Sequence, residues 1–98
     1  MARAQPIEIS GMHFAKKGDA SDYLKAMLNK YDLKDKVSEV DSVFLHAALL
    51  KHPDAKAKIG CGVKYFYVDR ADYGTRCFWL HRTDGTHERF SYKSCLGN

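Results

Sequence analysis

The fold is decided by residues 58–96, which read KIGCGVKYFYVDRADYGTRCFWLHRTDGTHERFSYKSCL. Three runs within it, 63–69, 76–83 and 86–92, are rich in β-branched and aromatic residues and are separated by glycine-bearing turns. Asp84-Gly85 between the last two runs is a strong short-range signal for a β-hairpin. The stretch therefore predicts a small, mainly antiparallel sheet.

The residues upstream predict two helices. Over 19–31 the apolar residues recur at helical spacing and form one stripe, with Asp19 as a suitable N-cap. A second helix is expected over 39–51, because Pro53 disfavours helical geometry at the residue before it. Its expected core stripe consists of Val40, Val43, Phe44, Ala47 and Leu50, widened by Leu45 and Leu49.

Two shorter signals complete the predicted fold. Ser38 and Asp41 have the spacing of a capping box, with Asp in place of the usual Glu or Gln. The alternating run at 6–10 predicts a short strand at a sheet edge. We therefore expect an α+β fold in which two helices pack on one face of a three- to four-stranded sheet. The whole chain, 1–98, is expected to form one domain, with residues 1–5 flexible.

Length and composition favour one globular domain. The chain has 98 residues, of which 45% are hydrophobic, so it can build one core and is not of the disordered class. The net charge is +4. Residues 51–98 hold nine Lys or Arg against five Asp or Glu, whereas 1–50 hold seven of each. This asymmetry favours an anionic partner, although an ordinary lysine surplus on a solvated surface explains it equally well.

Cellular placement is inferred from what the sequence lacks. The N-terminal residues contain no apolar run of signal-peptide length, and no segment is long enough to span a membrane. Three cysteines, an odd number, predict reduced thiols that act as small apolar core residues. We therefore expect a soluble, cytoplasmic protein.

A two-residue Asp84-Gly85 turn fixes a register with Thr83 opposite Thr86. The face expected to pack on the helices then carries Cys77, Trp79, Phe90 and Tyr92. The opposite face mixes two apolar residues with basic ones, namely Phe78, Leu80, Arg76, Arg82, His87 and Arg89. A one-residue slip in register, such as a bulge, would exchange the two faces.

Arginines interleaved with an aromatic ring on an exposed sheet face are typical of single-stranded nucleic-acid binding. The guanidinium groups engage phosphates, and the ring stacks on an unpaired base. The candidate binding residues are Lys58, Lys64, Arg76, Phe78, Arg82, His87 and Arg89. In the alternative interpretation, Phe78 and Leu80 belong to a second core layer and the arginines form its solvated rim.

The turn Gly60-Cys61-Gly62 also admits two interpretations. Two glycines at this spacing allow a backbone nest that cradles a phosphate. They equally suit a tight turn that leads into a strand, since a lone GxG lacks the nucleotide-binding fingerprint.

Catalysis is not expected. His81 opposite Glu88 could supply an acid and a base, but strand alternation places His81 and His87 on opposite faces. Carboxylates do not converge at one point, so neither a metal ion nor a cofactor is predicted.

The patterns HPDAKAKIGCGV, RCFWLHRTDG and FSYKSCL closely resemble the DCL ("defective chloroplasts and leaves") domain family, in its stand-alone bacterial or phage-like form. The similarity covers roughly residues 12–96. Carried over by position, the matching residues are His52, Pro53, Lys58, Ile59, Gly60, Gly62, Arg76, Cys77, Phe78, Arg82, Asp84, Gly85, Phe90, Ser91 and Cys95. Arg89 departs from the family pattern, which often has an acidic residue before the FSY.

The resemblance implies a small α+β domain associated with RNA processing or transcription, without established catalytic residues. Two functions follow as hypotheses. The first is a non-catalytic module that binds RNA or single-stranded nucleic acid. The second is a protein-interaction module, or a small inhibitor, that docks on a larger nucleic-acid machine.

Overall fold

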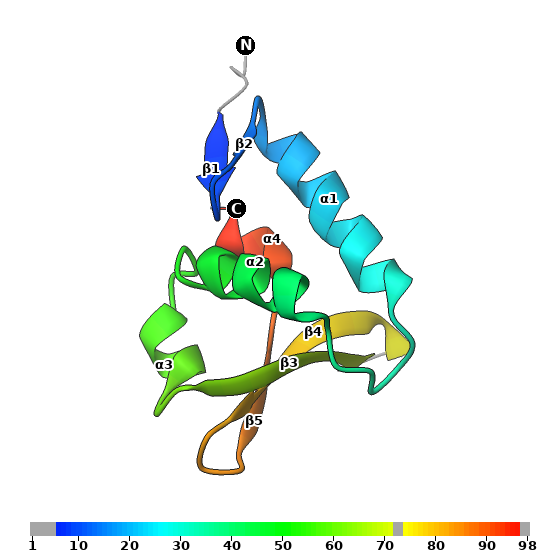
Figure 1. Cartoon of the computed structure of the whole chain (residues 1–98), viewed down its shortest axis with the longest axis vertical. Coiled ribbons are helices and arrows are strands. Elements are labelled where there is room, and N and C mark those ends of the chain that lie inside the picture. The colour runs from blue at the N-terminus through cyan, green and yellow to red at the C-terminus, as the bar shows by residue number, and fades with distance from the viewer. Residues whose placement is uncertain (1–5, 72–73, 97–98) are drawn as a thin grey trace.

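The computed structural model describes residues 6–71 and 74–96, so the prediction that residues 1–5 are flexible lies outside it. Figure 1 shows an α+β fold, as the sequence predicts, with two short helices beyond the two expected ones. The elements in chain order are β1 (Ile7–Ile9), β2 (Met12–Phe14), α1 (Lys17–Lys30), α2 (Glu39–Leu49), α3 (Ala55–Ile59), β3 (Val63–Arg70), β4 (Arg76–Arg82), β5 (His87–Phe90) and α4 (Tyr92–Cys95).

The main sheet is antiparallel, with the strand order β3-β4-β5. Helices α1, α2 and α4 lie on one side of it (Figure 1). The side chains that the sheet turns toward these helices are buried, namely Phe66, Val68, Phe78, Leu80 and Phe90. They join Leu24, Leu28, Leu45, Leu49 and Leu96 in one hydrophobic core. The expected arrangement of helices over one face of the sheet is confirmed.

The N-terminal strand is not an edge of the main sheet, so that part of the prediction is wrong. β1 pairs with β2 in a separate two-stranded sheet, with Ile7 opposite Phe14. Ser10 and Gly11 both have positive φ, 52° and 80°, as a two-residue type I′ turn requires. The hairpin is held by Phe14, whose ring lies 5.7 Å from that of Tyr23 on α1. Its two strands thus share the core without joining the larger sheet.

The β4–β5 hairpin differs from its predicted register by one residue. Phe78 pairs with Phe90, and Trp79 pairs with Arg89. The Arg82 amide donates to the Thr86 carbonyl at 2.7 Å, so Thr83, Asp84 and Gly85 form the loop, and Gly85 has a φ of 90°. This is the three-residue loop in which a type I turn is followed by a left-handed residue. The slip exchanges the faces of β4, so the predicted placement of Phe78, Leu80 and Trp79 is wrong, whereas Phe90 lies in the core as predicted.

The linker between α1 and α2 adds a short extended segment to the free edge of β3. The Val37 amide donates to the Phe66 carbonyl at 3.0 Å, and the Val68 amide donates to the Asp35 carbonyl at 3.1 Å. Lys36 bridges to Tyr67 between these bonds. The segment satisfies backbone groups that an edge strand would otherwise leave open. It also places Lys36 beside the outer face of the sheet.

The buried side of α1 matches its prediction, whereas that of α2 matches it only at Phe44, Leu45 and Leu49. Ala20, Leu24, Met27 and Leu28 are buried as expected, although α1 begins after Lys16 rather than Asp19. On α2 the buried residues are Asp41, Phe44, Leu45, Ala48 and Leu49. Val40, Val43 and Leu50 were expected in the core but are 78%, 58% and 59% exposed. The helix is therefore rotated relative to the predicted stripe.

The rotation of α2 is explained by a polar network at its N-terminus. Asp41 accepts hydrogen bonds from the Tyr31 hydroxyl at 2.6 Å and from Lys30 Nζ at 2.7 Å. Ser38 Oγ accepts from the Asp41 amide at 3.2 Å, which confirms the predicted N-cap. The Ser38 amide donates to the Tyr31 hydroxyl instead of to the Asp41 carboxylate. Tyr31 thus stands inside the capping box and ties α2 to the end of α1.

We expect Asp41→Asn to lower the free energy of unfolding by about 1–3 kcal/mol at pH 7, because a largely buried charged acceptor is lost. Burial alone would raise the pKa of Asp41, but the bonds from Lys30 and Tyr31 outweigh it and hold the pKa below its ordinary value of 3.8. The stabilisation is therefore complete above that value and is lost as the pH falls through the lower folded-state pKa. Urea unfolding at several pH values measures both effects.

Asp22→Asn serves as the control, since Asp22 is an exposed carboxylate on α1. It should change the stability little at any pH. If the difference between wild type and Asp41→Asn stayed constant from pH 7 into the acid range, the ionic role of Asp41 would be excluded.

Candidate nucleic-acid interface

The outer face of the main sheet carries two rows of side chains, each with one residue from every strand. Tyr65 pairs with His81, which pairs with His87. In the next row Tyr67 pairs with Trp79, and Trp79 pairs with Arg89. The residues of these rows are exposed or half-buried, whereas Phe66, Phe78 and Leu80 between them are at most 1% exposed. We call Tyr65, Tyr67, Trp79, His81 and His87 the aromatic face.

The rings of the aromatic face form a continuous surface. His81 lies flat on Tyr65, with centroids 4.9 Å apart and an interplanar angle of 6°. Tyr67 and Trp79 stack at 6.2 Å, and Trp79 meets His87 at 5.6 Å. The indole Nε1 of Trp79 is covered and has no hydrogen-bond partner among the described residues. Rings locked against one another in this way offer a preformed stacking surface.

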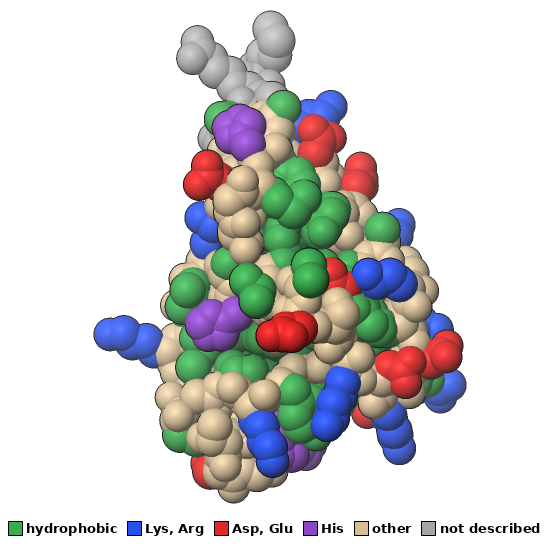
Figure 2. Space-filling model, in the orientation of Figure 1, with side chains coloured by type: hydrophobic (Ala, Val, Ile, Leu, Met, Phe, Trp, Pro, Cys, Tyr) green, Lys and Arg blue, Asp and Glu red, His purple; other side chains and the backbone are tan. Residues whose placement is uncertain are grey.

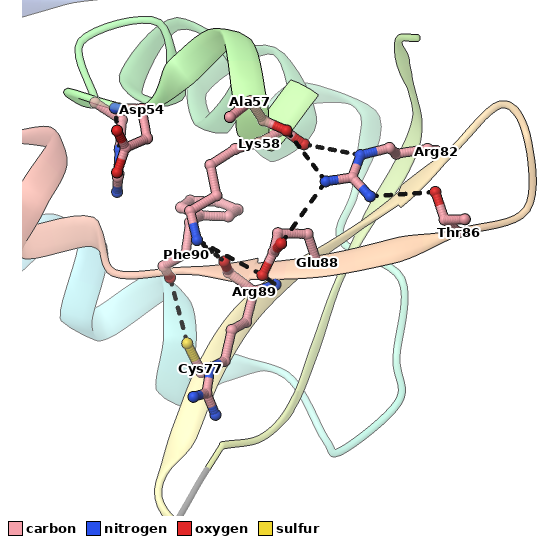
Figure 3. A network of polar contacts seen from close by, with 10 residues as sticks. Asp54, Ala57, Lys58, Cys77, Arg82, Thr86, Glu88, Arg89 and Phe90 are labelled. Atoms are coloured by element: carbon pink, nitrogen blue, oxygen red, sulfur yellow. Dashed lines mark hydrogen bonds and ion pairs between the residues drawn. The ribbon is translucent and has the colours of Figure 1, made fainter. Parts of the chain in front are cut away.

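Positive charge borders the aromatic face on two sides. Lys36 Nζ lies 4.3 Å from the centre of the Tyr65 ring, a cation–π contact. Arg89 lies on β5 beside Trp79, and Figure 3 shows its side chain extending toward Cys77. Burial, followed by the nearby Asp69 carboxylate, raises the pKa of Tyr67, so this phenol stays neutral and can donate a hydrogen bond. The face therefore combines rings, a neutral donor and cations.

The predicted site residues fall into four groups. Phe78 is fully buried, so its predicted role as a stacking platform is wrong: the register slip turns it into the core. His87 and Arg89 lie on the outer face, where their neighbours include Trp79 and Tyr67 and not Phe78. Lys64 and Arg76 are exposed at opposite ends of the sheet, and Lys64 occupies the irregularity between Val63 and Tyr65.

Lys58 and Arg82 form the fourth group and hold the chain together internally. The Arg82 guanidinium donates to the carbonyls of Lys58 and Ala57 at 3.0 and 3.3 Å. Lys58 Nζ donates to the Arg89 carbonyl at 3.0 Å, and both cations lie within 4 Å of the Glu88 carboxylate (Figure 3). The Arg82 side chain is only 15% exposed. These residues fasten α3 to the β4–β5 hairpin, so their predicted role as phosphate contacts is not supported.

The Gly60-Cys61-Gly62 turn ends α3. The amides of Gly60 and Gly62 donate to the Lys56 and Ile59 carbonyls at 2.9 and 3.0 Å. Gly60 has a φ of 57°, and a Cβ there would lie 3.0 Å from Arg82 Nε. Glycine is needed because the backbone is left-handed and the guanidinium packs against it. Since both amides are occupied, the turn interpretation holds and a phosphate nest of these amides does not.

The cysteines and metal-ligating groups offer no further centre among the described residues. Cys61, Cys77 and Cys95 are free thiols, and of these only Cys95 is buried, so the predicted core role holds for that cysteine. Burial raises the pKa of Cys95 to about 12, which keeps it unreactive. In the described parts of the chain, no three His, Cys, Asp or Glu side chains cluster as metal ligands would. No helix there is long and apolar enough to cross a membrane.

The sequence reasoning missed Tyr65, Tyr67, Trp79, His81 and Lys36. A signal for four of them was present in the alternation of ring types along two strands. In β3 the polar-tipped Tyr65 and Tyr67 alternate with Phe66 and Val68, and β4 repeats this pattern. Tyr, Trp and His carry a polar group that prefers water, whereas Phe, Val and Leu do not. The position of Lys36 depends on the edge pairing of the linker and has no such signal.

Comparisons with known proteins place this geometry in a family. The solution NMR structure of an uncharacterized protein from Rhodospirillum rubrum is 61% identical, covers 97% of this chain and 91% of its own, and superposes with a TM-score of 0.87. From Arabidopsis thaliana, DNA-directed RNA polymerase IV subunit 1 is 38% identical over 77 residues, or 78% of this chain. Protein DCL homolog, chloroplastic, is 36% identical over 70 residues, or 68% of this chain.

The chain spans 5% of the length of the polymerase subunit and 32% of that of the DCL homolog. The match to the DCL homolog confirms the resemblance found in the sequence. Residues 25–96, which include α2, the whole main sheet and the aromatic face, match the family model "Protein of unknown function (DUF3223)", and the chain belongs to that family.

Proposed function

We propose that this domain binds single-stranded RNA on its aromatic face and does not cleave it. The observation that carries the proposal is the continuous ring surface of β3, β4 and β5, with Lys36 and Arg89 at its borders. Bases stack on such rings without requiring a fixed sequence, while cations contact the backbone. The names of two relatives, an RNA polymerase subunit and a DCL homolog, favour a role in RNA processing or transcription.

Cleavage has to be considered because His81 and His87 lie opposite each other on one face, contrary to their predicted placement on opposite faces. His81 lies flat against Tyr65, an arrangement suited to extending a stacking surface. We therefore assign both histidines to binding. Recovery of full-length oligonucleotide after incubation with the protein would support this assignment, and strand scission would overturn it.

Binding of a labelled single-stranded RNA, followed by fluorescence anisotropy, is expected to weaken steeply as salt is added. Lys36→Ala combined with Arg89→Ala should reduce the slope of log K against log salt by about 1.4, since each phosphate contact on a single strand contributes about 0.7. Lys16→Ala combined with Lys51→Ala removes the same charge from exposed sites elsewhere and should leave the slope nearly unchanged. No binding at low salt would refute the proposed function.

A second candidate function is protein interaction, favoured by the exposed side of α2. Val40, Val43 and Leu50 lie along one side of this helix and are more than half exposed. Figure 2 shows hydrophobic side chains gathered over α2 and toward α1. A protein partner that is retained after nuclease treatment, and lost when Val43 is replaced by Asp, would favour this function. A partner released by nuclease would favour RNA binding.

A further inference from the structure

A groove of about 440 Å³ opens between α1, the start of β4 and the chain that follows β5. It is separate from the two rows of the aromatic face. Its lining comes from three parts of the chain, namely one side of α1 from Lys25 to Asn29, residues 75–78 and residues 90–93. Its volume lies within the range of about 300–1,000 Å³ that is usual for small-molecule sites.

The lining combines an apolar floor with a cationic rim. Leu28, Phe78 and Phe90 are at most 7% exposed, so they form the base of the groove. The Tyr92 ring stands edge-on to Phe78, with centroids 6.2 Å apart. The charged residues of the lining are Lys25, Arg76 and Lys93, all exposed, and the lining contains neither Asp nor Glu.

This charge pattern favours a ligand with a flat apolar part and an anionic part. Arg76 Nη1 donates to the Tyr31 carbonyl at 2.6 Å, which fixes the direction of the guanidinium. A planar guanidinium held in this way is preorganised for a phosphate, and the two lysines add to its field. The half-buried Tyr92 ring between them and the floor suits the face of a base.

The groove is continuous with the aromatic face through Cys77. Cys77 lines the groove and lies two residues before Trp79 on β4. Burial raises the pKa of the Cys77 thiol although the positive charge of Arg89 opposes the rise, and Figure 3 shows the Arg89 side chain extending toward this thiol. Cys77 pairs with Asp69 on β3, so a strand that crosses Trp79 and Arg89 reaches the groove on the β5 side of Cys77, away from that carboxylate.

We propose that the groove receives one nucleotide of the single strand bound on the aromatic face. Its base packs on the half-buried Tyr92 ring, above the apolar floor, and its phosphate contacts Arg76 and the flanking lysines. This inference rests on the proposed function and adds a discrete nucleotide pocket to the open stacking surface.

Amide chemical shifts of the whole protein during titration with AMP test the pocket directly. We expect saturable shifts at Lys25, at residues 75–77 and at residues 91–93. Adenosine alone and inorganic phosphate alone should each bind at least about fivefold more weakly, because each offers half of the recognised chemistry. The absence of shifts at these residues with AMP, or phosphate binding as tight as that of AMP, would overturn the pocket.

Two double variants distinguish binding in the pocket from binding on the aromatic face. Arg76→Ala combined with Lys93→Ala should weaken AMP about fivefold or more and an RNA oligonucleotide about three- to tenfold, as expected for lost charged hydrogen bonds. Tyr67→Ala combined with Trp79→Ala should leave AMP binding unchanged while it weakens the oligonucleotide. Lys16→Ala combined with Lys51→Ala is the charge-matched control, and amide dispersion reports whether each variant is folded.

The outcomes distinguish the two proposals. If the oligonucleotide binds but loses nothing in Arg76→Ala/Lys93→Ala, and AMP leaves the groove unshifted, the pocket fails and the proposed function stands. If AMP shifts the groove but no oligonucleotide binds, the proposed function fails, and so does the inference that the strand enters the groove. An acidic aromatic peptide that binds the groove more tightly than AMP would also overturn the nucleotide pocket, since the groove would then be a binding site for protein.

Discussion

Replacing Tyr67 and Trp79 together by alanine is expected to weaken single-stranded RNA binding by at least about 30-fold, since each base–ring stack contributes about 1–3 kcal/mol. These two rings stack at 6.2 Å in the central row of the sheet, with Arg89 completing the row. Their removal also takes away the contact between Trp79 and His87, so the surface loses its continuity. Fluorescence anisotropy at constant salt measures the loss.

Two controls make this result specific. Tyr67→Phe combined with Trp79→Phe keeps rings in both positions and should retain most of the affinity. His13→Ala removes an exposed ring on β2, which is not part of the main sheet, and should have no effect. Alanine variants that stay folded and bind RNA as tightly as wild type would exclude the aromatic face as the binding surface.

The turn at Asp84-Gly85 shows how far the sequence predicts this fold. It correctly predicts a hairpin, but a two-residue turn and a three-residue loop both accept a glycine with positive φ at this position. The choice depends on whether Thr83 ends the strand or enters the loop. In the structure Thr83 enters the loop, where its amide donates to the Gly62 carbonyl at 3.0 Å. Because that bond comes from a distant turn, local sequence could not reveal the register or the outer face.

Helix α2 was predicted as an element but not in its orientation, for a related reason. Apolar residues lie on two sides of this helix, with Phe44 and Leu45 on one and Val40 and Val43 on the other. Hydrophobic periodicity alone cannot choose between two apolar sides. The choice is made by Asp41, which must lie where Lys30 and Tyr31 can reach it. Helix α1 has only one apolar side, and its buried side was predicted correctly, although the helix begins before the predicted N-cap Asp19.

The candidate site, too, was only partly predictable, because tertiary contacts cannot be inferred from local sequence. His87 and Arg89 were predicted on the binding face, and they lie on the outer face of the sheet. Lys58 and Arg82 look from sequence like free cations, but the carbonyls at the end of α3 and the Glu88 carboxylate occupy them. The sequence alone does not reveal whether a basic side chain contacts a ligand or another part of the chain. Tertiary contacts decide that, and here they involve residues more than twenty positions apart.

Phe78→Ala is expected to lower the free energy of unfolding by about 3–5 kcal/mol, the usual cost of truncating a fully buried phenylalanine. The ring is 0% exposed and stacks on Phe90 at 6.0 Å with an interplanar angle of 17°. Tyr92 meets it edge-on, so the truncation leaves a cavity bordered by aromatic rings. A loss of this size is a large part of the total stability of a small domain, about 5–15 kcal/mol. Urea unfolding followed by circular dichroism measures it.

The neighbouring residue supplies the comparison that makes the Phe78 result decisive for the register. Phe78→Leu fills most of the cavity and should cost less than about 2 kcal/mol. Trp79 is half-buried on the outer face, so Trp79→Ala should cost less stability than Phe78→Ala although it removes a larger ring. In the register with Thr83 opposite Thr86 the order would be reversed, because Trp79 would then pack under the helices. A larger loss of stability in Trp79→Ala than in Phe78→Ala would therefore contradict both the observed pairing and the binding face built on it.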